Sequence, residues 1–508
     1  MNPALGWPYW LRLLLAASLG IVAACGLAPL GFWPAALVAL ILLTPLYLNS
    51  ETSRRAALLG WVFATGYFAH ALNWIIEPFM VDAERHAWMA PFALIFLSGG
   101  LALFWALAFG VAKRIGGSPI VQGMLLALTL SLAEFARGYI LTGFPWAGIA
   151  QVWVDTPFAQ LLSLIGPYGL GALTLIATLP LGAAISSDRS PRGLGMPIFV
   201  AAGCAVLALA YAANRPSVEY TDHIVRLIQP NAPQHQKWDP EYAPLFFARQ
   251  LEFTVAEPRP DLIVWPETSV PAWLGSAQPY LSAIGEAAQG TPVFLGIQRA
   301  DGRQIYNSMI YLNGDGQQAG LYDKHHLAPF GEYVPFGELM ARFGIHGMAA
   351  TTGSGFSAGP GAALMDAGGL GKALPLICYE AVFTQDVLSA PGRADFLLQI
   401  TNDAWFGPRS GPYQHLAQAQ MRAIEQGLPM LRSANTGVSA MIDPLGRITD
   451  ALALGQAGFI DAELPQSQAA TIYSRIGDKP VFFLLLAAWA LLWRHTRRFN
   501  GQIPIDPT

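Results

Sequence analysis

Residues 374–380 read Leu-Pro-Leu-Ile-Cys-Tyr-Glu, an apolar run that ends in a thiol and a carboxylate. A short apolar run bounded by polar residues is typical of a strand that is buried on both faces. Similar runs lie at residues 223–228, 262–265, 293–297, 309–312 and 396–400. Helix-like stretches lie between them, for example at residues 241–252 and 415–426. Strands that alternate with helices predict one layered α/β domain, which we place at residues 216–476.

Three polar residues stand in conspicuous places: Glu267, Lys324 and Cys378. Glu267 and Cys378 stand at the ends of strand-like segments, where the sheets of α/β proteins bind ligands. Singly, such a glutamate or lysine is usually a solvated turn residue and such a cysteine is usually a small core residue. Together they supply a thiol nucleophile, a carboxylate that can deprotonate it and a cation that can stabilise an oxyanion.

The rest of the chain is much more apolar. Of the 508 residues, 53% are hydrophobic and only 12% are charged, which is about half the charge of a typical soluble domain. A helix needs about 20 apolar residues to span a bilayer. The sequence predicts eight such helices, at residues 9–27, 32–48, 56–76, 89–112, 119–137, 168–186, 197–213 and 481–493. We therefore expect a transmembrane domain of seven helices at residues 1–215, and a last helix with a tail at residues 477–508.

The basic residues of the short loops indicate the orientation, because lysine and arginine are retained on the cytoplasmic side. They follow each even-numbered predicted helix, at Arg54, Arg55, Lys113, Arg114, Arg189, Arg192, Arg494, Arg497 and Arg498. This pattern predicts that both termini are cytoplasmic and that the α/β domain lies outside. A net charge of −4 without a long basic tract argues against nucleic acid as a partner.

The order of the motifs resembles the nitrilase, or carbon-nitrogen hydrolase, superfamily. Trp-Pro-Glu stands at residues 265–267, Asp-Lys at 323–324 is followed by Leu-Ala-Pro-Phe-Gly-Glu-Tyr at 327–333, and Cys-Tyr-Glu stands at 378–380. With seven helices before this domain and one after it, the whole chain resembles the apolipoprotein N-acyltransferase family. Three further stretches are similar to that family, at residues 306–308, 401–406 and 432–437.

The resemblance implies a multi-span α-helical membrane domain joined to a nitrilase-like αββα sandwich. It implies that Glu267, Lys324 and Cys378 form the catalytic triad. Glu332 and Glu380 match supporting carboxylates, which could hold Lys324 charged and oriented. Trp238 and Tyr379 match positions that contact substrate.

The resemblance also implies the reaction and its partners. A fatty acyl chain would move from a phospholipid, with phosphatidylethanolamine as the favoured donor, to Cys378 as a thioester. It would then pass to the free α-amine of the diacylglyceryl-cysteine of an apolipoprotein, in the final step of bacterial lipoprotein maturation. No metal and no other cofactor is expected. The enzyme would be a multi-pass protein of the bacterial inner membrane with its catalytic domain in the periplasm.

Two other functions stay open from the residues alone. A membrane-tethered amidase would use the same thioester chemistry with water as the acceptor and an amide as the substrate. A transporter or scaffold would carry a degenerate nitrilase-like domain, against which the intact set of three residues argues. The apolar segment at residues 336–343 could be a lid that dips into lipid, or a packed surface helix.

Overall fold

The computed structural model describes residues 7–187, 191–335 and 355–500. The chain divides into two compact units. The first contains Met1–Ile76, Trp88–Arg215 and Ile472–Thr508, and the second contains Glu77–Ala87 and Pro216–Thr471. The segment for which a lid was considered, at residues 336–343, lies outside the described residues.

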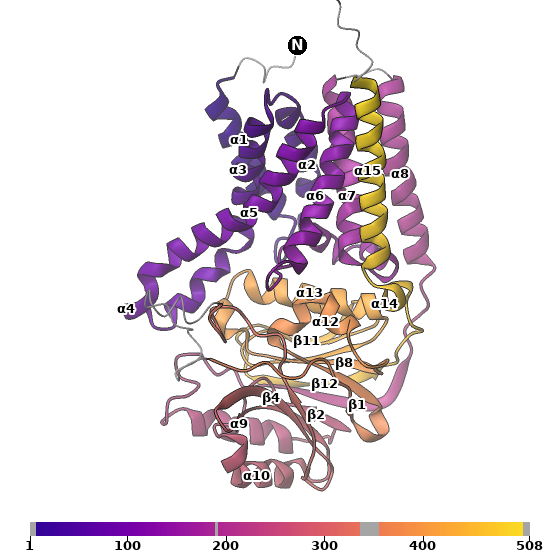
Figure 1. Cartoon of the computed structure of the whole chain (residues 1–508). Helices are drawn as coiled ribbons and strands as arrows, with labels where there is room; N and C mark the ends of the chain where they lie inside the picture. The colour runs from indigo at the N-terminus through magenta and orange to yellow at the C-terminus, as the bar shows by residue number, and fades with distance from the viewer. Residues whose placement is uncertain (1–6, 188–190, 336–354, 501–508) are drawn as a thin grey trace, which may run out of the picture. The chain divides into compact units, whose positions relative to one another are not determined.

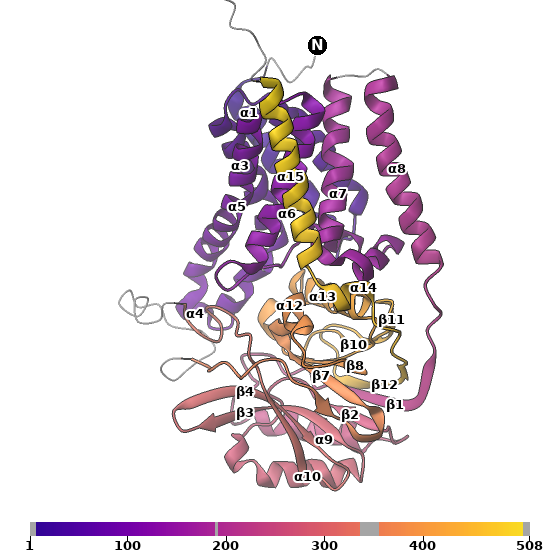
Figure 2. The ribbon, with the colours of Figure 1, turned by 45° about the vertical axis from the view of Figure 1, so that its right-hand side comes forward.

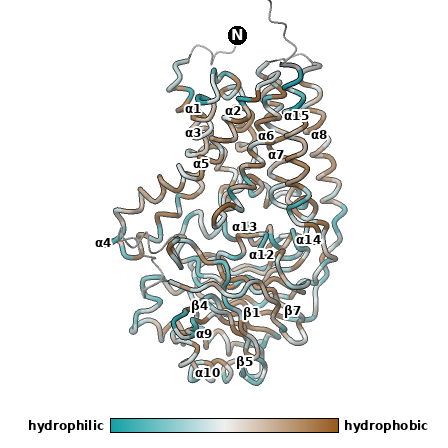
Figure 3. The backbone as a smooth tube through the Cα atoms, viewed as in Figure 1, coloured by the Kyte–Doolittle hydropathy of each residue, from teal (hydrophilic) through white to brown (hydrophobic). Residues whose placement is uncertain are grey.

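The first unit is a helical bundle (Figure 1). Its helices are α1 (Tyr9–Ala24), α2 (Trp33–Leu48), α3 (Ser53–Ala71), α5 (Ala90–Ile115), α6 (Pro119–Tyr139), α7 (Leu162–Ser187), α8 (Pro191–Ala213), α14 (Ile472–Ile476) and α15 (Lys479–Asn500). Hydrophobic residues run along its long helices (Figure 3). Within the described part of the chain, four helical stretches are long and apolar enough to cross a membrane: Ala83–Ile115, Pro119–Tyr139, Pro157–Ser187 and Leu194–Ala213. The helices α1 and α2 are apolar but shorter, and α3 and α15 are not among the four, so the number of eight spans stays a prediction.

The last helix is longer than its apolar run. α15 has 22 residues, which at 1.5 Å per residue gives about 33 Å, enough for a hydrocarbon core of about 30 Å. The apolar run at residues 481–493 stops at Arg494, whereas the helical backbone continues. Leu485 of α15 packs with Phe135 of α6 and Ala172 of α7, beside which α15 runs (Figure 2).

The second unit is built on two six-stranded sheets. The first has the order β12-β1-β2-β3-β4-β5 and the second has the order β11-β10-β9-β8-β7-β6. The strands are β1 (Tyr220–Gln229), β2 (Leu262–Val264), β3 (Val293–Asp301), β4 (Gln304–Leu312), β5 (Gln318–Asp323), β6 (Met365–Asp366), β7 (Lys372–Ile377), β8 (Phe396–Thr401), β9 (Met430–Ala434), β10 (Ser439–Ile442), β11 (Ile448–Leu452) and β12 (Gly458–Pro465). Three neighbouring strands are parallel in the middle of each sheet, β1-β2-β3 and β7-β8-β9, and the outer strands are antiparallel.

Each of the six apolar runs singled out from the sequence coincides with a strand, and both helix-like stretches coincide with helices, α9 (Ala243–Val255) and α13 (Gly411–Gln426). Strands without an apolar run escaped notice. β11, for example, reads Ile-Thr-Asp-Ala-Leu and none of its residues is buried. It lies at the edge of its sheet, where no second neighbour demands a continuous apolar surface.

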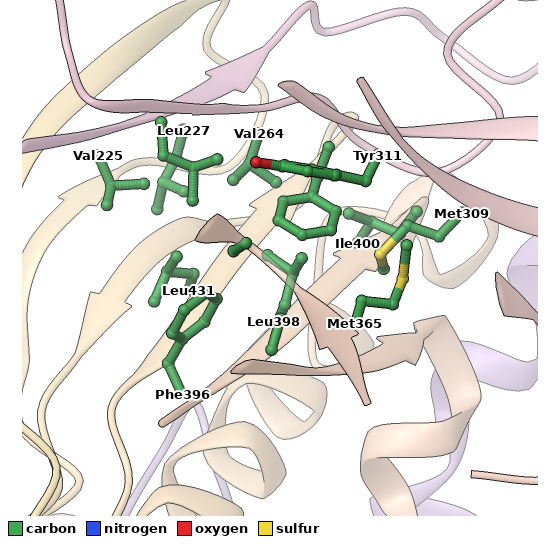
Figure 4. Packing of buried hydrophobic residues seen from close by; sticks show 14 of the residues in the cluster. Val225, Leu227, Val264, Met309, Tyr311, Met365, Phe396, Leu398, Ile400 and Leu431 are labelled. Carbon is green, nitrogen blue, oxygen red and sulfur yellow. The ribbon is translucent and has the colours of Figure 1, made fainter. Parts of the chain in front are cut away.

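The apolar side chains form three layers of contact. The central one lies between the sheets, where Val225, Leu227 and Val264 of the first sheet face Phe396, Leu398 and Leu431 of the second (Figure 4). A second cluster packs α9 and α10 (Gln278–Ala288) on the first sheet. A third packs α13 on the second sheet. The unit is therefore the expected αββα sandwich.

Candidate active site

The three candidate catalytic side chains follow the ends of three strands. Glu267 lies three residues after β2, and Lys324 and Cys378 directly follow β5 and β7. The strands β2 and β5 belong to one sheet and β7 to the other. Glu267 and Lys324 both shift the pKa of Cys378, and Glu267 and Cys378 both shift the pKa of Lys324. The sandwich thus brings together a carboxylate, an ammonium and a thiol, all of them buried.

The turn that carries Glu267 passes unusually close to strand β3. Gly296 of β3 donates its N–H to the Pro266 carbonyl at 3.2 Å. A Cβ at Gly296 would lie 2.4 Å from the backbone nitrogen of Thr268 and 2.7 Å from the Cα of Glu267. Thr268 itself has φ +44°, a left-handed conformation that is rare for a β-branched residue. The absence of a side chain at position 296 therefore allows this turn to place the carboxylate of Glu267.

Asn307 of β4 links both acidic residues of the site to the lysine. Its Nδ2 donates to Glu267 Oε1 at 2.6 Å and to Glu332 Oε1 at 3.2 Å. Its carbonyl accepts the backbone N–H of Lys324 at 2.9 Å. The sequence placed Asn307 in a family-like stretch without assigning it a role, because only the sheet register sets it between the two carboxylates.

Lys324 and Glu332 form a buried ion pair. The distance from Lys324 Nζ to Glu332 Oε2 is 2.8 Å, and the lysine side chain is 1% exposed. The Ala328 N–H donates to the same carboxylate at 2.8 Å and holds it in place. Burial lowers the pKa of Lys324, but Glu332, Cys378 and Glu267 together raise it above its ordinary value. The ammonium is therefore charged at neutral pH and can stabilise a negative oxygen.

The carboxylate of Glu267 is buried, unlike that of an ordinary surface glutamate. Burial raises its pKa, Lys324 opposes this shift and Glu332 adds to it, and the net pKa lies above the ordinary value. A glutamate with a raised pKa is a better proton acceptor, as a general base requires.

Cys378 has a protonated thiol in the resting site. Burial raises its pKa, Glu267 raises it further, and the lowering effect of Lys324 does not compensate. The thiolate is the nucleophilic form, so the reaction needs a base beside the sulfur. Glu267 is a carboxylate that can serve as one.

The Glu380 carboxylate binds groups other than the Lys324 ammonium. It accepts hydrogen bonds from the Tyr322 hydroxyl at 2.9 Å, from the His325 N–H at 2.8 Å and from the Ile377 N–H at 2.7 Å. These partners stand next to Lys324 and Cys378 in the chain. Glu380 therefore ties together the two segments that carry the lysine and the cysteine, whereas the direct partner of the ammonium is Glu332.

The two candidate substrate-contact residues lie in different surroundings. Trp238 is 44% exposed and lines a shallow pocket together with Lys237. The Lys237 ammonium donates to the Glu267 carbonyl at 2.9 Å and lies 5.5 Å from the centre of the Trp238 ring. Tyr379 is buried, and its ring packs edge-on against Phe383 with 4.9 Å between the ring centres. Lys237 was not predicted from the sequence, where its only signal was its place before Trp238.

No metal centre accompanies these side chains in the described residues, where no group of three or more His, Cys, Asp or Glu side chains could hold an ion. The chemistry that the site itself offers is covalent. A buried thiol, a basic carboxylate and a fixed ammonium suit acyl transfer through a thioester.

Two family models match the chain. Residues 254–473 match the carbon-nitrogen hydrolase family, and residues 19–179 match the N-terminal domain of apolipoprotein N-acyltransferase. A protein from Rhodopseudomonas palustris named apolipoprotein N-acyltransferase is 34% identical over 95% of this chain and 95% of its own. One of the same name from Bradyrhizobium diazoefficiens is 36% identical over 97% of this chain and 96% of its own.

Two solved structures are more distant. A CN-hydrolase superfamily protein from Xanthomonas campestris is 21% identical and covers 57% of this chain and 98% of its own, with a TM-score of 0.36. An amidase from Nesterenkonia sp. is 17% identical and covers 52% of this chain and 96% of its own, with a TM-score of 0.37.

Proposed function

The chain belongs to the apolipoprotein N-acyltransferase family, and we propose that Glu267, Lys324 and Cys378 carry out its acyl transfer. The enzyme transfers a fatty acyl chain from a phospholipid to the free α-amine of the N-terminal diacylglyceryl-cysteine of apolipoproteins, the final step of bacterial lipoprotein maturation. The observation that supports the assignment of residues is the buried ion pair of Lys324 and Glu332. It keeps a cation next to a thiol and a basic carboxylate.

In the first half-reaction, the Glu267 carboxylate takes the proton of the Cys378 thiol. The thiolate attacks the ester carbonyl of the phospholipid and forms a tetrahedral intermediate. The Lys324 ammonium and backbone N–H groups stabilise its negative oxygen. The C–O bond to the glycerol then breaks, and Glu267 returns the proton to the departing oxygen. The products are a lysophospholipid and a thioester on Cys378.

In the second half-reaction, the neutral α-amine of the apolipoprotein attacks the thioester carbonyl. Glu267 takes a proton from the attacking nitrogen, and Lys324 again stabilises the oxyanion. The C–S bond breaks, the sulfur of Cys378 takes the proton back from Glu267, and an amide leaves the site. The two half-reactions form a ping-pong mechanism, in which the phospholipid and the apolipoprotein react in turn at the same cysteine.

The membrane unit suits these substrates, because both carry acyl chains. Moving such a chain into water costs about 0.8 kcal/mol for each methylene. A site that is joined to apolar helices avoids this cost by keeping the chains in lipid. We propose phosphatidylethanolamine as the preferred donor, since the resemblance of the motifs implies it. Equal acylation rates from vesicles of phosphatidylethanolamine, phosphatidylglycerol and phosphatidylcholine would contradict that preference.

Intact-protein mass spectrometry tests the assignment of the nucleophile. Purified protein is incubated with phosphatidylethanolamine, and the Cys378→Ala variant is treated beside it. We expect the wild type to gain the mass of one acyl chain, which hydroxylamine removes, and the variant to gain none. Cys204→Ala is the matched control, because Cys204 lies on α8, and it should be acylated like the wild type. An adduct that persists in Cys378→Ala would show that another residue is the nucleophile.

A membrane-tethered amidase is the rival reading of the same thioester chemistry. It would release ammonia from a small amide and would give no lysophospholipid. Release of lysophospholipid together with acyl transfer to a diacylated peptide amine excludes it.

We further propose that the protein lies in the inner membrane, with both termini in the cytoplasm and the catalytic unit in the periplasm. The basic residues that follow the even-numbered spans support this orientation. Asp315 lies in the exposed β4–β5 turn, and the Asp315→Cys substitution in a chain whose native cysteines are replaced tests the orientation. A membrane-impermeant maleimide should label this cysteine on intact spheroplasts. Labelling only after permeabilisation would reverse the orientation.

A further inference from the structure

The backbone of Cys378 is held in a conformation that a residue with a side chain seldom adopts. Its φ is +51°, and the left-handed region costs roughly 1–2 kcal/mol for such a residue. Hydrogen bonds hold the backbone before and after it. The Ile377 N–H donates to Glu380 at 2.7 Å, and the Cys378 carbonyl accepts from Gln399 Nε2 at 3.1 Å. Strain of this kind persists only where the surrounding structure imposes it.

The amide of Gln399 is oriented by a charged neighbour. Gln399 lies in the middle of β8 and is fully buried. The Arg432 guanidinium donates to its Oε1. Because a guanidinium can only donate, it fixes the oxygen of the amide on its own side and turns the Nε2 toward the Cys378 carbonyl. Arg432 is held in turn by Asp403 Oδ2 at 2.5 Å and by the Val438 carbonyl at 3.1 Å.

His415 of α13 is the second side chain at the same carbonyl. Its Nε2 lies 3.0 Å from the Cys378 oxygen and its Nδ1 lies 2.9 Å from Asp403 Oδ1. Burial lowers the pKa of His415, Asp403 raises it and Arg432 lowers it, with a net value below the ordinary one. A neutral ring carries one N–H, which donates to the Cys378 carbonyl when it is on Nε2 and to Asp403 when it is on Nδ1. The bond from Gln399 does not depend on this proton, so the carbonyl keeps a donor in either tautomer. We call Gln399, His415, Asp403 and Arg432 the carbonyl clamp.

The clamp has a consequence for the other side of the peptide. In a trans peptide, the carbonyl oxygen and the next N–H point in opposite directions. A Cys378 carbonyl that is held against Gln399 and His415 therefore directs the Tyr379 N–H away from them. We propose that Gln399 and His415, the latter with its proton on Nε2, are positioning residues, which fix the Cys378 carbonyl and so aim the Tyr379 N–H at the oxyanion. This inference rests on the proposed role of Cys378 as the nucleophile.

A role in packing alone is the alternative. All four side chains of the clamp are fully buried. Buried polar groups cost free energy unless every one is bonded, and apolar residues of similar size are often as stable or more stable in their place. The convergence of two of them on one carbonyl, at the candidate nucleophile, therefore favours a positioning role.

Two substitutions of His415 separate the alternatives. In His415→Gln the longer amide can still donate to the Cys378 carbonyl but loses Asp403. In His415→Asn the shorter amide can still donate to Asp403 but loses the carbonyl. Positioning predicts that His415→Gln acylates within about threefold of the wild type and that His415→Asn is slowed at least tenfold, since losing a fixed donor at an oxyanion site costs about 100- to 1000-fold. Packing alone predicts the same loss in both.

The full chain is acylated from phosphatidylethanolamine in detergent micelles, and the rate of thioester formation is followed by intact mass. The thermal midpoint is measured for each variant. Gln399→Met, which removes the donor and keeps the length, should be slowed about tenfold, less than the roughly 100- to 1000-fold for a lost oxyanion donor, because His415 still contacts the carbonyl. Gln420→Ala is the matched control, because Gln420 lies on the same helix and donates to the Gly446 carbonyl at 2.9 Å. It should lower the midpoint and leave the rate unchanged.

The outcomes separate this inference from the proposed function. A wild type that forms no thioester overturns the function itself. A wild type that forms one, with both His415 variants equally slowed, equally unchanged or in the reverse order, overturns the positioning role. If Gln399→Met folds and reacts at the wild-type rate, the role is also overturned. If that variant does not fold, the order of the two His415 variants decides.

Discussion

Replacing Glu332 by glutamine should remove most of the reactivity of the site with only a moderate loss of stability. The carboxylate accepts from Lys324 Nζ and Ala328 N–H on Oε2 and from Asn307 Nδ2 on Oε1. A glutamine offers one acceptor oxygen and places an NH₂ group at the other position. Either Asn307 or the pair of Lys324 and Ala328 then faces a donor instead of an acceptor.

The magnitude follows from this exchange. A hydrogen bond to a charged group contributes about 1.5–3 kcal/mol, and breaking a buried ion pair completely costs about 3–5 kcal/mol. Because the amide oxygen keeps part of the contact, we expect a loss of about 2 kcal/mol. For a domain of this size that corresponds to a fall of ~4–8 °C in thermal midpoint. The rate of thioester formation should fall about 100-fold, since the oxyanion donor Lys324 is no longer fixed.

Thioester formation is measured by intact mass in a single turnover at neutral pH, and unfolding by the intrinsic fluorescence of the full chain in micelles. Glu286→Gln is the matched control, because Glu286 is exposed on α10, and it should change neither quantity. A Glu332→Gln variant that is acylated as fast as the wild type would refute the reasoning. It would mean that Lys324 needs no carboxylate partner to act.

Three further changes test other parts of the site. Gly296→Ala places a Cβ 2.4 Å from the backbone of Thr268 and should cost about 1–3 kcal/mol and most of the acylation rate, whereas Gly275→Ala, whose Cβ would meet nothing within 4 Å, should cost neither. Burial and the neighbouring carboxylate raise the pKa of Glu267 above 4.5, so the acylation rate should rise with pH through that raised pKa, and Glu267→Gln should lose both the rate and this dependence. Burial lowers the pKa of His325, but the carboxylates of Asp386 and Glu380 raise it to about 10. A raised histidine pKa gives stability that is complete below pH 6.5 and is lost toward pH 10, so the difference in thermal midpoint between wild type and His325→Asn should shrink over that window; a constant difference would show that these charges do not stabilise the fold.

The strands β9 and β10 are buried throughout but were not predicted, because polar residues interrupt their apolar runs. Strands with a continuous apolar run could be predicted. β2, β7 and β8 were found in this way, and with them the positions of Glu267 and Cys378 at strand ends. Edge strands such as β11 were not found, because an edge that faces solvent leaves no apolar run in the sequence. The length of α15 was also underestimated, since a helix continues through residues that are no longer apolar.

The residues of the candidate site also differ in whether the sequence could predict their roles. The motifs around Glu267, Lys324 and Cys378 were visible because each is a short run of neighbouring residues in the chain. The roles of Asn307 and Gln399 were not visible, because both lie inside strands and act on residues from other elements. Their partners are set by the register between strands, which no local pattern encodes.

The sequence by itself determined the apolar segments, the strands with a continuous apolar run and the three chemical groups of the site, since each depends on residues that are neighbours in the chain. The tertiary structure alone decided that Glu332, and not Glu380, pairs with Lys324. It also decided that Gly296 makes room for the Glu267 turn and that Gln399 and His415 meet at the Cys378 carbonyl. These contacts join residues from different strands and helices, and only the packing of the two sheets and of α13 brings them within bonding distance.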